Sequence, residues 1–423
     1  MTSIPSDPEI IVIGAGAAGL SAAKELARLG LTCVVVEGAH RIGGRAHAQK
    51  IAPGIWFDLG CAWLVGGAAN PFTPIAENLG IALSKDKRAA FTLAEHRFVR
   101  NGAPLNADER ATCLQFYRDS LDRIEAAARE SRDVALSDVV NADNAFAAPF
   151  MGAVATAWGL DFDRVSTVDF ASAAGENEYQ VFRGYGNLIA SWGADVAVSL
   201  DTPAERIDRA GNSVRVETPK GTLSARAVLI TVSTGVLAHG DIGFAPALPA
   251  WKRNAIHALP MGTENKIGLH FDRDIFGPDG RGYYTTWRDD ETAAKVDAGV
   301  MGPNTAVVLV GGRQAIGLER EGPEALTGYA LDRVADIFGN DIRKHVGRAI
   351  PTSWHSEPRT RGSWACAEPG QAHQRAALAR PVDDRLFFAG EATLYESQGT
   401  CHGAYLSGIR AAREIAEKVK THD

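Results

Sequence analysis

The chain has 423 residues, which as a loose guide corresponds to two or three domains. Hydrophobic residues make up 45% and charged residues 22%, as in ordinary soluble globular proteins. Lys and Arg number 44 against 51 Asp and Glu, so the net charge is −7 and no basic block is present. No apolar run reaches the roughly 18 residues that span a bilayer, and the first residues lack the pattern of a signal peptide. We therefore expect no nucleic-acid partner and no membrane partner.

The cysteines are scattered and odd in number, and none forms a CxxC pair: Cys33, Cys61, Cys113, Cys366 and Cys401. This pattern is typical of a reduced protein with neither a disulfide framework nor a zinc site. We expect a cytoplasmic location and no bound metal.

The first predicted elements form a βαβ unit. An apolar run at 10–13 predicts a strand, and a helical pattern follows that closes at Gly30. A second apolar strand covers 31–36 and ends at Glu37. The glycines of the sequence GAGAAG lie at the turn between the first strand and the helix.

The remaining elements follow at longer intervals. Residues 106–148 have helical spacing and predict a helical subdomain. Apolar runs predict strands at 196–199, 214–217, 227–232, 267–271, 305–310 and 385–389, and residues 399–408 open a final helix. Because no linker separates these elements, we expect interwoven domains.

The glycine turn predicts a dinucleotide site, because a strand precedes it, a helix follows it and an acid ends the next strand. Gly14 allows the sharp turn, and Gly16 allows a pyrophosphate to approach the helix N-terminus. Gly19 allows the helix to pack closely on the strand, and Glu37 is placed to bind a ribose diol.

Two further segments suit the same ligand. Gly43, Gly44 and Arg45 follow Glu37, and the Arg45 guanidinium is expected to contact a pyrophosphate. Near the other end, Gly390 and Glu391 follow a strand and precede the last helix. Two helix N-termini would then bind a pyrophosphate and an electron-rich flavin ring.

These residues resemble the flavin-containing amine oxidases, a family that includes monoamine oxidases, polyamine oxidases and lysine-specific histone demethylases. The resemblance runs from about residue 9 to 415, and the stretch 399–408 is most similar to the polyamine oxidase and demethylase branches. It rests on the glycine turn with Glu37 and on the motifs RIGGR (41–45), DLG (58–60) with Trp63, RGYG (183–186), TVSTGVL (231–237), NKI (265–267), Trp354, RGSW (361–364), GEAT (390–393) and HGAYLSG (402–408). The resemblance disfavours a demethylase, since the long helical insertion of those enzymes is missing.

The resemblance implies an α/β (α+β) fold in which a Rossmann-type FAD-binding domain is interwoven with a substrate-binding domain of mixed sheet plus helices. We assign residues 1–75, 182–255 and 357–423 to the FAD-binding domain, and residues 76–181 and 256–356 to the substrate-binding domain. The implied reaction moves a hydride from the amine α-carbon to flavin N5, gives an imine that is hydrolysed, and reduces O₂ to H₂O₂. The expected partners are a small-molecule amine and O₂, with a possible homo-oligomer.

The resemblance also implies roles for individual residues. Lys266 matches the lysine that bonds through a water to flavin N5, and Trp354 matches a tryptophan beside the flavin. Trp364 and Thr400 fall where monoamine oxidases carry two facing tyrosines, so one wall of the expected amine cage is aromatic and the other is a small hydroxyl. The implied cofactor-binding residues are Gly14, Gly16, Ala18, Gly19, Glu37, Gly43, Gly44, Arg45, Gly60, Cys61, Ala62, Trp63, Ala204, Thr231, Trp354, Gly390, Glu391, Thr400, His402 and Ala404.

The attachment of the flavin also follows from the resemblance. Ser363 stands where monoamine oxidases carry the cysteine that binds the flavin, so we expect noncovalent FAD. Cys366 and Cys401 are expected to be small packing residues near the site.

The substrate is less defined. Val65 stands where plant polyamine oxidases carry a glutamate, and the other candidate acids, Asp161, Glu176, Glu178 and Glu264, are expected to be solvated surface charges. Two alternatives stay open. An L-amino-acid oxidase would pair the substrate carboxylate with an arginine such as Arg183, Arg281 or Arg313, and a non-catalytic scaffold would bind FAD without turnover.

Overall fold

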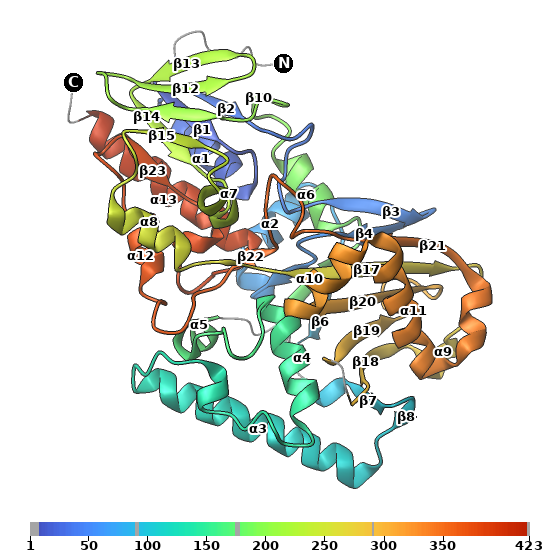
Figure 1. Ribbon diagram of the computed structural model, residues 1–423. Helices are drawn as coiled ribbons and strands as arrows, with labels where there is room; N and C mark the ends of the chain where they lie inside the picture. Colours follow the sequence, from blue (N-terminus) through green and yellow to red (C-terminus); the bar gives the residue numbers. More distant parts are fainter. Residues whose placement is uncertain (1–7, 89–92, 174–177, 290–291, 421–423) are drawn as a thin grey trace.

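The computed structural model describes residues 8–88, 93–173, 178–289 and 292–420. The chain folds into two lobes, and a long helix lies beneath the junction between them (Figure 1). One lobe holds the glycine turn and the C-terminal helix, and the other holds the largest sheet.

The first lobe is built on a parallel sheet that gathers strands from distant parts of the chain. Its order is β10 (Val198–Ser199), β2 (Cys33–Val36), β1 (Ile10–Ile13), β14 (Ala227–Ile230) and β23 (Leu386–Phe388). The inner strands are fully buried aliphatic runs, as expected for a parallel sheet covered on both faces. One face packs on α1 (Ala17–Arg28) and α13 (Cys401–Lys420). The order agrees with the βαβ unit and with the later strands predicted from the sequence.

A smaller sheet and short helices complete this lobe. The sheet order is β13 (Gly221–Ala225), β12 (Val214–Thr218), β11 (Arg206–Asp208) and β15 (Gly243–Ala245). The helices are α6 (Tyr185–Trp192), α7 (Thr234–His239), α8 (Ala250–His257) and α12 (Gln374–Ala379).

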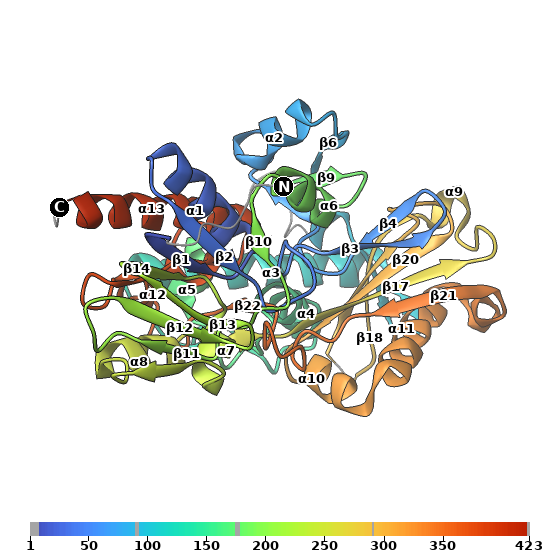
Figure 2. The same ribbon diagram turned by 90° about the horizontal axis from the view of Figure 1, so that it is seen from above.

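The second lobe is built on a mixed sheet. Its order is β21 (Val346–Pro351), β17 (Glu264–Phe271), β20 (Thr305–Gly311), β19 (Ala294–Ala298), β18 (Gly282–Trp287), β7 (Arg97–Arg100) and β8 (Ala103–Pro104). Its apolar face packs on α10 (Gly312–Glu321) and α11 (Pro323–Phe338), with α9 (Gly277–Gly280) at one edge. Figure 2 shows both long helices on the same side of this sheet.

Short pairings join the lobes. The hairpin of β3 (Ala48–Ala52) and β4 (Ile55–Asp58) packs against the second sheet through a small apolar cluster. The other pairings are β16 (Met261–Gly262) with β22 (Trp364–Ala365), and β9 (Glu178–Val181) with β5 (Trp63–Val65) and β6 (Leu83–Arg88). The chain therefore crosses between lobes several times, as expected for interwoven domains, while the exact boundaries stay a prediction.

The segment predicted to be helical contains helices joined by a long connection. Helix α3 (Ala107–Arg129) begins with a capping box in which Asn106 and Glu109 exchange side-chain and backbone hydrogen bonds. The helix ends at Arg129 and does not continue to 148. Residues 130–146, which include a 3-10 turn at Leu136–Asp138, connect α3 to α4 (Ala147–Trp158), and α5 (Thr167–Ser172) follows. Helix α2 (Phe72–Asn78) packs on the core of the first lobe. No helix in the described ranges is both long and apolar enough to cross a bilayer.

Candidate functional site

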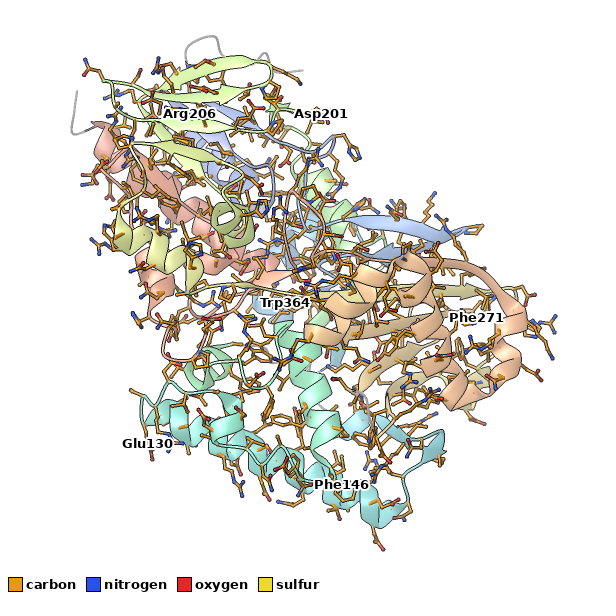
Figure 3. The ribbon with its side chains drawn as sticks, in the orientation of Figure 1. Glu130, Phe146, Asp201, Arg206, Phe271 and Trp364 are labelled. Carbon is orange, nitrogen blue, oxygen red and sulfur yellow. The ribbon has the colours of Figure 1, made fainter. Side chains whose placement is uncertain are left out.

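A cavity of about 1110 Å³ runs between the two lobes. This volume exceeds that of an ordinary small-ligand pocket, so the cavity has room for a large cofactor and a substrate. Nearly all the predicted site residues border it: Gly14, Gly16, Ala18, Glu37, Gly43, Gly44, Arg45, Gly60, Cys61, Ala62, Trp63, Ala204, Thr231, Lys266, Trp354, Trp364, Gly390, Glu391, Thr400 and Ala404. Figure 3 places Trp364 at the junction of the lobes. Gly19 and His402 do not border the cavity.

The glycine turn has the geometry of a phosphate cradle. A Cβ on Gly19 would lie 1.8 Å from the Gly14 carbonyl oxygen, so only glycine lets α1 pack this closely on the turn. A Cβ on Gly16 would meet no atom within 4 Å, because Gly16 faces the open cavity. No side chain caps α1, so its first backbone N–H groups are open to a ligand anion.

Glu37 braces this turn from the end of β2. Its carboxylate accepts hydrogen bonds from the backbone N–H groups of Ala15 (2.7 Å) and Ala39 (2.8 Å). Each carboxylate oxygen has more than one acceptor site, so the side chain keeps capacity for a ribose hydroxyl.

The second helix N-terminus lies beside the first. Helices α1 and α13 run parallel, since Gly408 lies against Ala18 and Arg413 donates to Glu25 (2.7 Å). Gly408 lies seven positions after Cys401, so the N-terminus of α13 extends about 10 Å beyond that contact. Both positive helix ends therefore face the same cavity at different depths, as a cofactor with a pyrophosphate and a distant ring requires.

Glu391 ties the halves of the site together. Its buried carboxylate accepts from Arg45 Nη1 (2.8 Å) and from the backbone N–H groups of Ala365 (3.1 Å) and Gly399 (3.2 Å). Arg45 Nη1 also donates to the Ser363 carbonyl oxygen (2.8 Å). Arg45 was expected to contact a pyrophosphate. In this structure its Nη1 atom instead links the N-terminal part of the chain to Ser363 and Glu391 in the C-terminal part.

Lys266 and Trp354 are held against the same turn after β4. Lys266 Nζ donates to the Gly60 carbonyl oxygen (2.5 Å), and Trp354 Nε1 donates to the Leu59 carbonyl oxygen (3.0 Å). A Cβ on Gly60 would lie 1.7 Å from the Arg45 carbonyl oxygen, so this turn must be glycine. Lys266 is buried and points into the cavity, unlike a surface lysine at a strand start.

Trp364 and Thr400 form neighbouring walls of the cavity. The Trp364 ring lies against Gly399, since a Cβ on that glycine would be 3.4 Å from ring atom Cδ1. The Thr400 hydroxyl accepts from Gly403 N (2.9 Å) and donates to the Ser397 carbonyl oxygen (2.7 Å). The Thr400 hydroxyl therefore caps the first turn of α13.

Two other predicted residues have structural roles. His402 points away from the cavity toward Asn70, with 3.3 Å between Nδ1 and Asn70 Nδ2, and burial lowers its pKa to about 4. Cys366 is buried and its Sγ donates to the Trp158 carbonyl oxygen (2.8 Å), in agreement with its predicted packing role.

The candidate acids and arginines fall into two groups, those that border the cavity and those that do not. Glu178 and Glu264 were expected to be solvated, and that expectation is wrong: both are buried and border the cavity. Asp161 pairs with Arg313 outside it, and Glu176 lies outside the described residues. Arg183, Arg281 and Arg313 do not border the cavity.

The far wall of the cavity was not predicted from the sequence. Side chains on one face of α3, together with parts of α4 and α5, close the end of the cavity away from the glycine turn. The α3 residues are Tyr117, Leu121, Glu125, Ala128 and Arg129. Their spacing is that of a helix face, but only the fold shows what this face covers. Within the described ranges, no group of three or more His, Cys, Asp or Glu side chains is placed to hold a metal ion.

Comparison with known proteins identifies the family of the chain. The family model for flavin-containing amine oxidoreductases matches residues 17–416. The chain belongs to the flavin-containing amine oxidoreductase family. It is therefore an amine oxidase, with the mixed α/β fold of that family.

Sequence relatives include plant enzymes. The chain is 27% identical over 451 residues to polyamine oxidase 4 of Oryza sativa subsp. japonica, covering 98% of this chain and 90% of that protein. It is 30% identical over 469 residues to lysine-specific histone demethylase 1 homolog 1 of the same plant, covering 97% of this chain but only 53% of that protein.

Solved structures show the same fold. A putrescine oxidase bound to putrescine superposes with a TM-score of 0.79 at 20% identity, covering 97% of this chain and 99% of that one. Cyclohexylamine oxidase from Brevibacterium oxydans IH-35A gives a TM-score of 0.79 at 21% identity, with 98% and 100% covered.

Proposed function

We propose that this amine oxidase binds FAD noncovalently and oxidises a small or medium alkyl amine, with O₂ as the electron acceptor. The overall reaction converts RCH₂NH₂, O₂ and water to an aldehyde, ammonia and H₂O₂. When bound, the flavin supplies the two-electron oxidation of the carbon beside the amine.

The observation that carries this proposal is the cavity with two parallel helix N-termini at different depths and Lys266 on the facing strand. The α1 N-terminus and Gly16 would hold the pyrophosphate, and the start of α13 would lie beside the flavin ring. Ser363 supports noncovalent binding, because it stands at the attachment position and has no thiol. Its hydroxyl is already engaged in hydrogen bonds with the Glu264 backbone.

The residues of the chain would bind and orient the amine. Trp364 offers an aromatic wall, which attracts a cation or packs on an alkyl chain. The far end beneath α3 leaves room for a substrate longer than the reacting carbon and nitrogen. The polyamine and putrescine oxidases among the relatives support an alkyl mono- or diamine.

The alternatives are weaker. The three arginines considered for an L-amino-acid oxidase do not border the cavity. A non-catalytic scaffold would release FAD on denaturation but consume no O₂ with any substrate.

The test is direct. The purified protein is denatured and filtered, and we expect all the yellow flavin to pass the filter as FAD. The native protein is then supplied with mono-, di- and polyamines and L-amino acids while O₂ uptake and H₂O₂ are measured. Turnover with an amine supports the proposal, and turnover with amino acids alone contradicts it.

A further inference from the structure

Glu264 is the feature of the cavity that the assigned roles do not explain. Its side chain is 8% exposed and borders the cavity. Its carboxylate makes no hydrogen bond or ion pair with the part of the chain that the structure describes. An unpaired buried carboxylate is costly, so an acid in this position indicates a ligand or a proton as its partner.

The position of Glu264 is fixed by its neighbours. It lies two residues before Lys266 on the same face of β17, so the two Cα atoms are about 6.6 Å apart. Its backbone N–H donates to Ser363 Oγ (2.9 Å), and Ser363 Oγ donates back to its carbonyl oxygen (3.0 Å). Glu264, Lys266 and Trp364 all border the cavity, so Glu264 lies among the residues that surround the expected amine site.

The residues that pair with Glu264 from β20 and from the Ser363 segment are uncharged. Gly311 faces it from β20, and the last turn of α4 packs on that glycine, with Ala155 O 1.8 Å from where a Cβ would stand. Neither contributes a charged group. Ser363 and Trp364, at the start of β22, are also uncharged, and the Arg45–Glu391 pair bonds the backbone of Ser363 and Ala365.

The charged groups near Glu264 come from its own strand and from β19. Lys266 and Lys295 favour its ionised form, and Asp297 disfavours it. Glu178 in turn favours the charged form of Lys295. Burial outweighs these effects and raises the pKa of Glu264 to about 7, which suits a group that exchanges protons near neutral pH.

A substrate amine creates the need for such a group. With a pKa near that of lysine, about 10.4, only about one primary amine in a thousand is neutral at pH 7.5. The ammonium has no lone pair to support oxidation of the neighbouring carbon.

We propose that Glu264 binds the ammonium group of the substrate and accepts its proton, so that the amine becomes neutral inside the cavity. The N–H bond breaks, an O–H bond forms on the carboxylate, and the electron pair stays on the amine nitrogen. This inference rests on the proposed function, because it concerns the same substrate.

The first test compares the pH dependence of flavin reduction by an amine in the wild-type holoenzyme and in Glu264→Gln, without O₂. In the wild type, the second-order rate constant should rise through the pKa of Glu264 and then stay level until the amine pKa. In Glu264→Gln it should be about 100-fold lower at pH 7 and climb about tenfold per pH unit toward the amine pKa. Glu264→Asp should recover part of the rate, and the exposed control Glu321→Gln should match the wild type.

The second test needs no turnover. tert-Butylamine has no hydrogen on the carbon beside nitrogen, so it binds without being oxidised. Calorimetry at pH 8 in buffers of different ionisation enthalpy counts the protons released on binding. The wild type should release almost none, since the proton stays on Glu264, and Glu264→Gln should release about one.

The outcomes are separable. Failure of the wild type to be reduced by any amine would overturn the proposed function itself. Reduction of the wild type with an identical pH profile in Glu264→Gln, or with a loss that is the same at every pH, would overturn the role of Glu264 alone.

Discussion

Gly16→Ala and Gly19→Ala form a matched pair that separates cofactor binding from folding. Gly16 has φ −77°, which alanine adopts without strain, and its added methyl would meet no protein atom within 4 Å. We therefore expect the free energy of unfolding of the cofactor-free protein to change by less than about 1 kcal/mol. The methyl would instead occupy the space through which a phosphate oxygen reaches the α1 N–H groups.

The cost to binding follows from that blocked approach. A hydrogen bond to a charged group contributes about 1.5–3 kcal/mol. Loss of one such bond should raise the dissociation constant of FAD by about 10- to 100-fold. Gly19→Ala differs, because its methyl would stand 1.8 Å from the Gly14 carbonyl oxygen. It should lower the free energy of unfolding by about 1–3 kcal/mol or more through overpacking.

Two assays on the cofactor-free proteins decide the matter. FAD titration followed by flavin fluorescence gives the dissociation constants, and urea unfolding gives the stabilities. If Gly16→Ala bound FAD as tightly as the wild type, the cradle assigned to α1 would be wrong. A greater loss of stability in Gly16→Ala than in Gly19→Ala would also refute the reasoning.

Three further predictions concern other parts of the chain. Lys266→Met should keep its FAD content but slow reoxidation of the reduced flavin in air by at least about tenfold, as seen by stopped flow; unchanged reoxidation would contradict the expected role of the lysine. Asp169→Asn should lower the free energy of unfolding, measured in urea, by about 3–5 kcal/mol, because it breaks a buried bidentate pair with Arg375 (2.8 and 2.9 Å). The control Asp163→Asn, which breaks an exposed pair with Arg313, should lower it by less than about 1 kcal/mol. Burial raises the pKa of Asp58 from 3.8 to about 6, so between these pH values the folded state binds a proton that the unfolded state does not. As pH rises from about 4 to 7, the free energy of unfolding of the wild type should therefore fall by up to about 3 kcal/mol relative to that of Asp58→Asn. Urea unfolding that gives the same pH dependence for both proteins would contradict this prediction.

The cofactor half of the site was largely predictable because its signal is local. Strand, glycine turn, helix and terminal acid fall within 28 residues, from Ile10 to Glu37, and the structure places them as the pattern indicates. The later segments were recognised by resemblance, and they converge on the same cavity. Arg45 shows the limit of this approach, since its partner Glu391 lies 346 residues away in the sequence.

The substrate half could not be predicted in the same way. Strand β17 is buried along almost its whole length, so no alternation of polar and apolar residues marks which side faces a cavity. Glu264 pairs with Gly311 of β20 and bonds the segment that carries Ser363, contacts that only the tertiary fold creates. The helical spacing of α3 likewise did not reveal that one of its faces closes the cavity.

Anaerobic flavin reduction tests the central claim most directly. The FAD-loaded protein is mixed without O₂ with an alkyl amine, and the absorbance of the oxidised flavin is followed. The account predicts loss of this absorbance with at least one amine class and its return when air is admitted, with one H₂O₂ formed per flavin. Fully bound FAD that stays oxidised with every mono-, di- and polyamine would contradict the assignment of this cavity to amine oxidation.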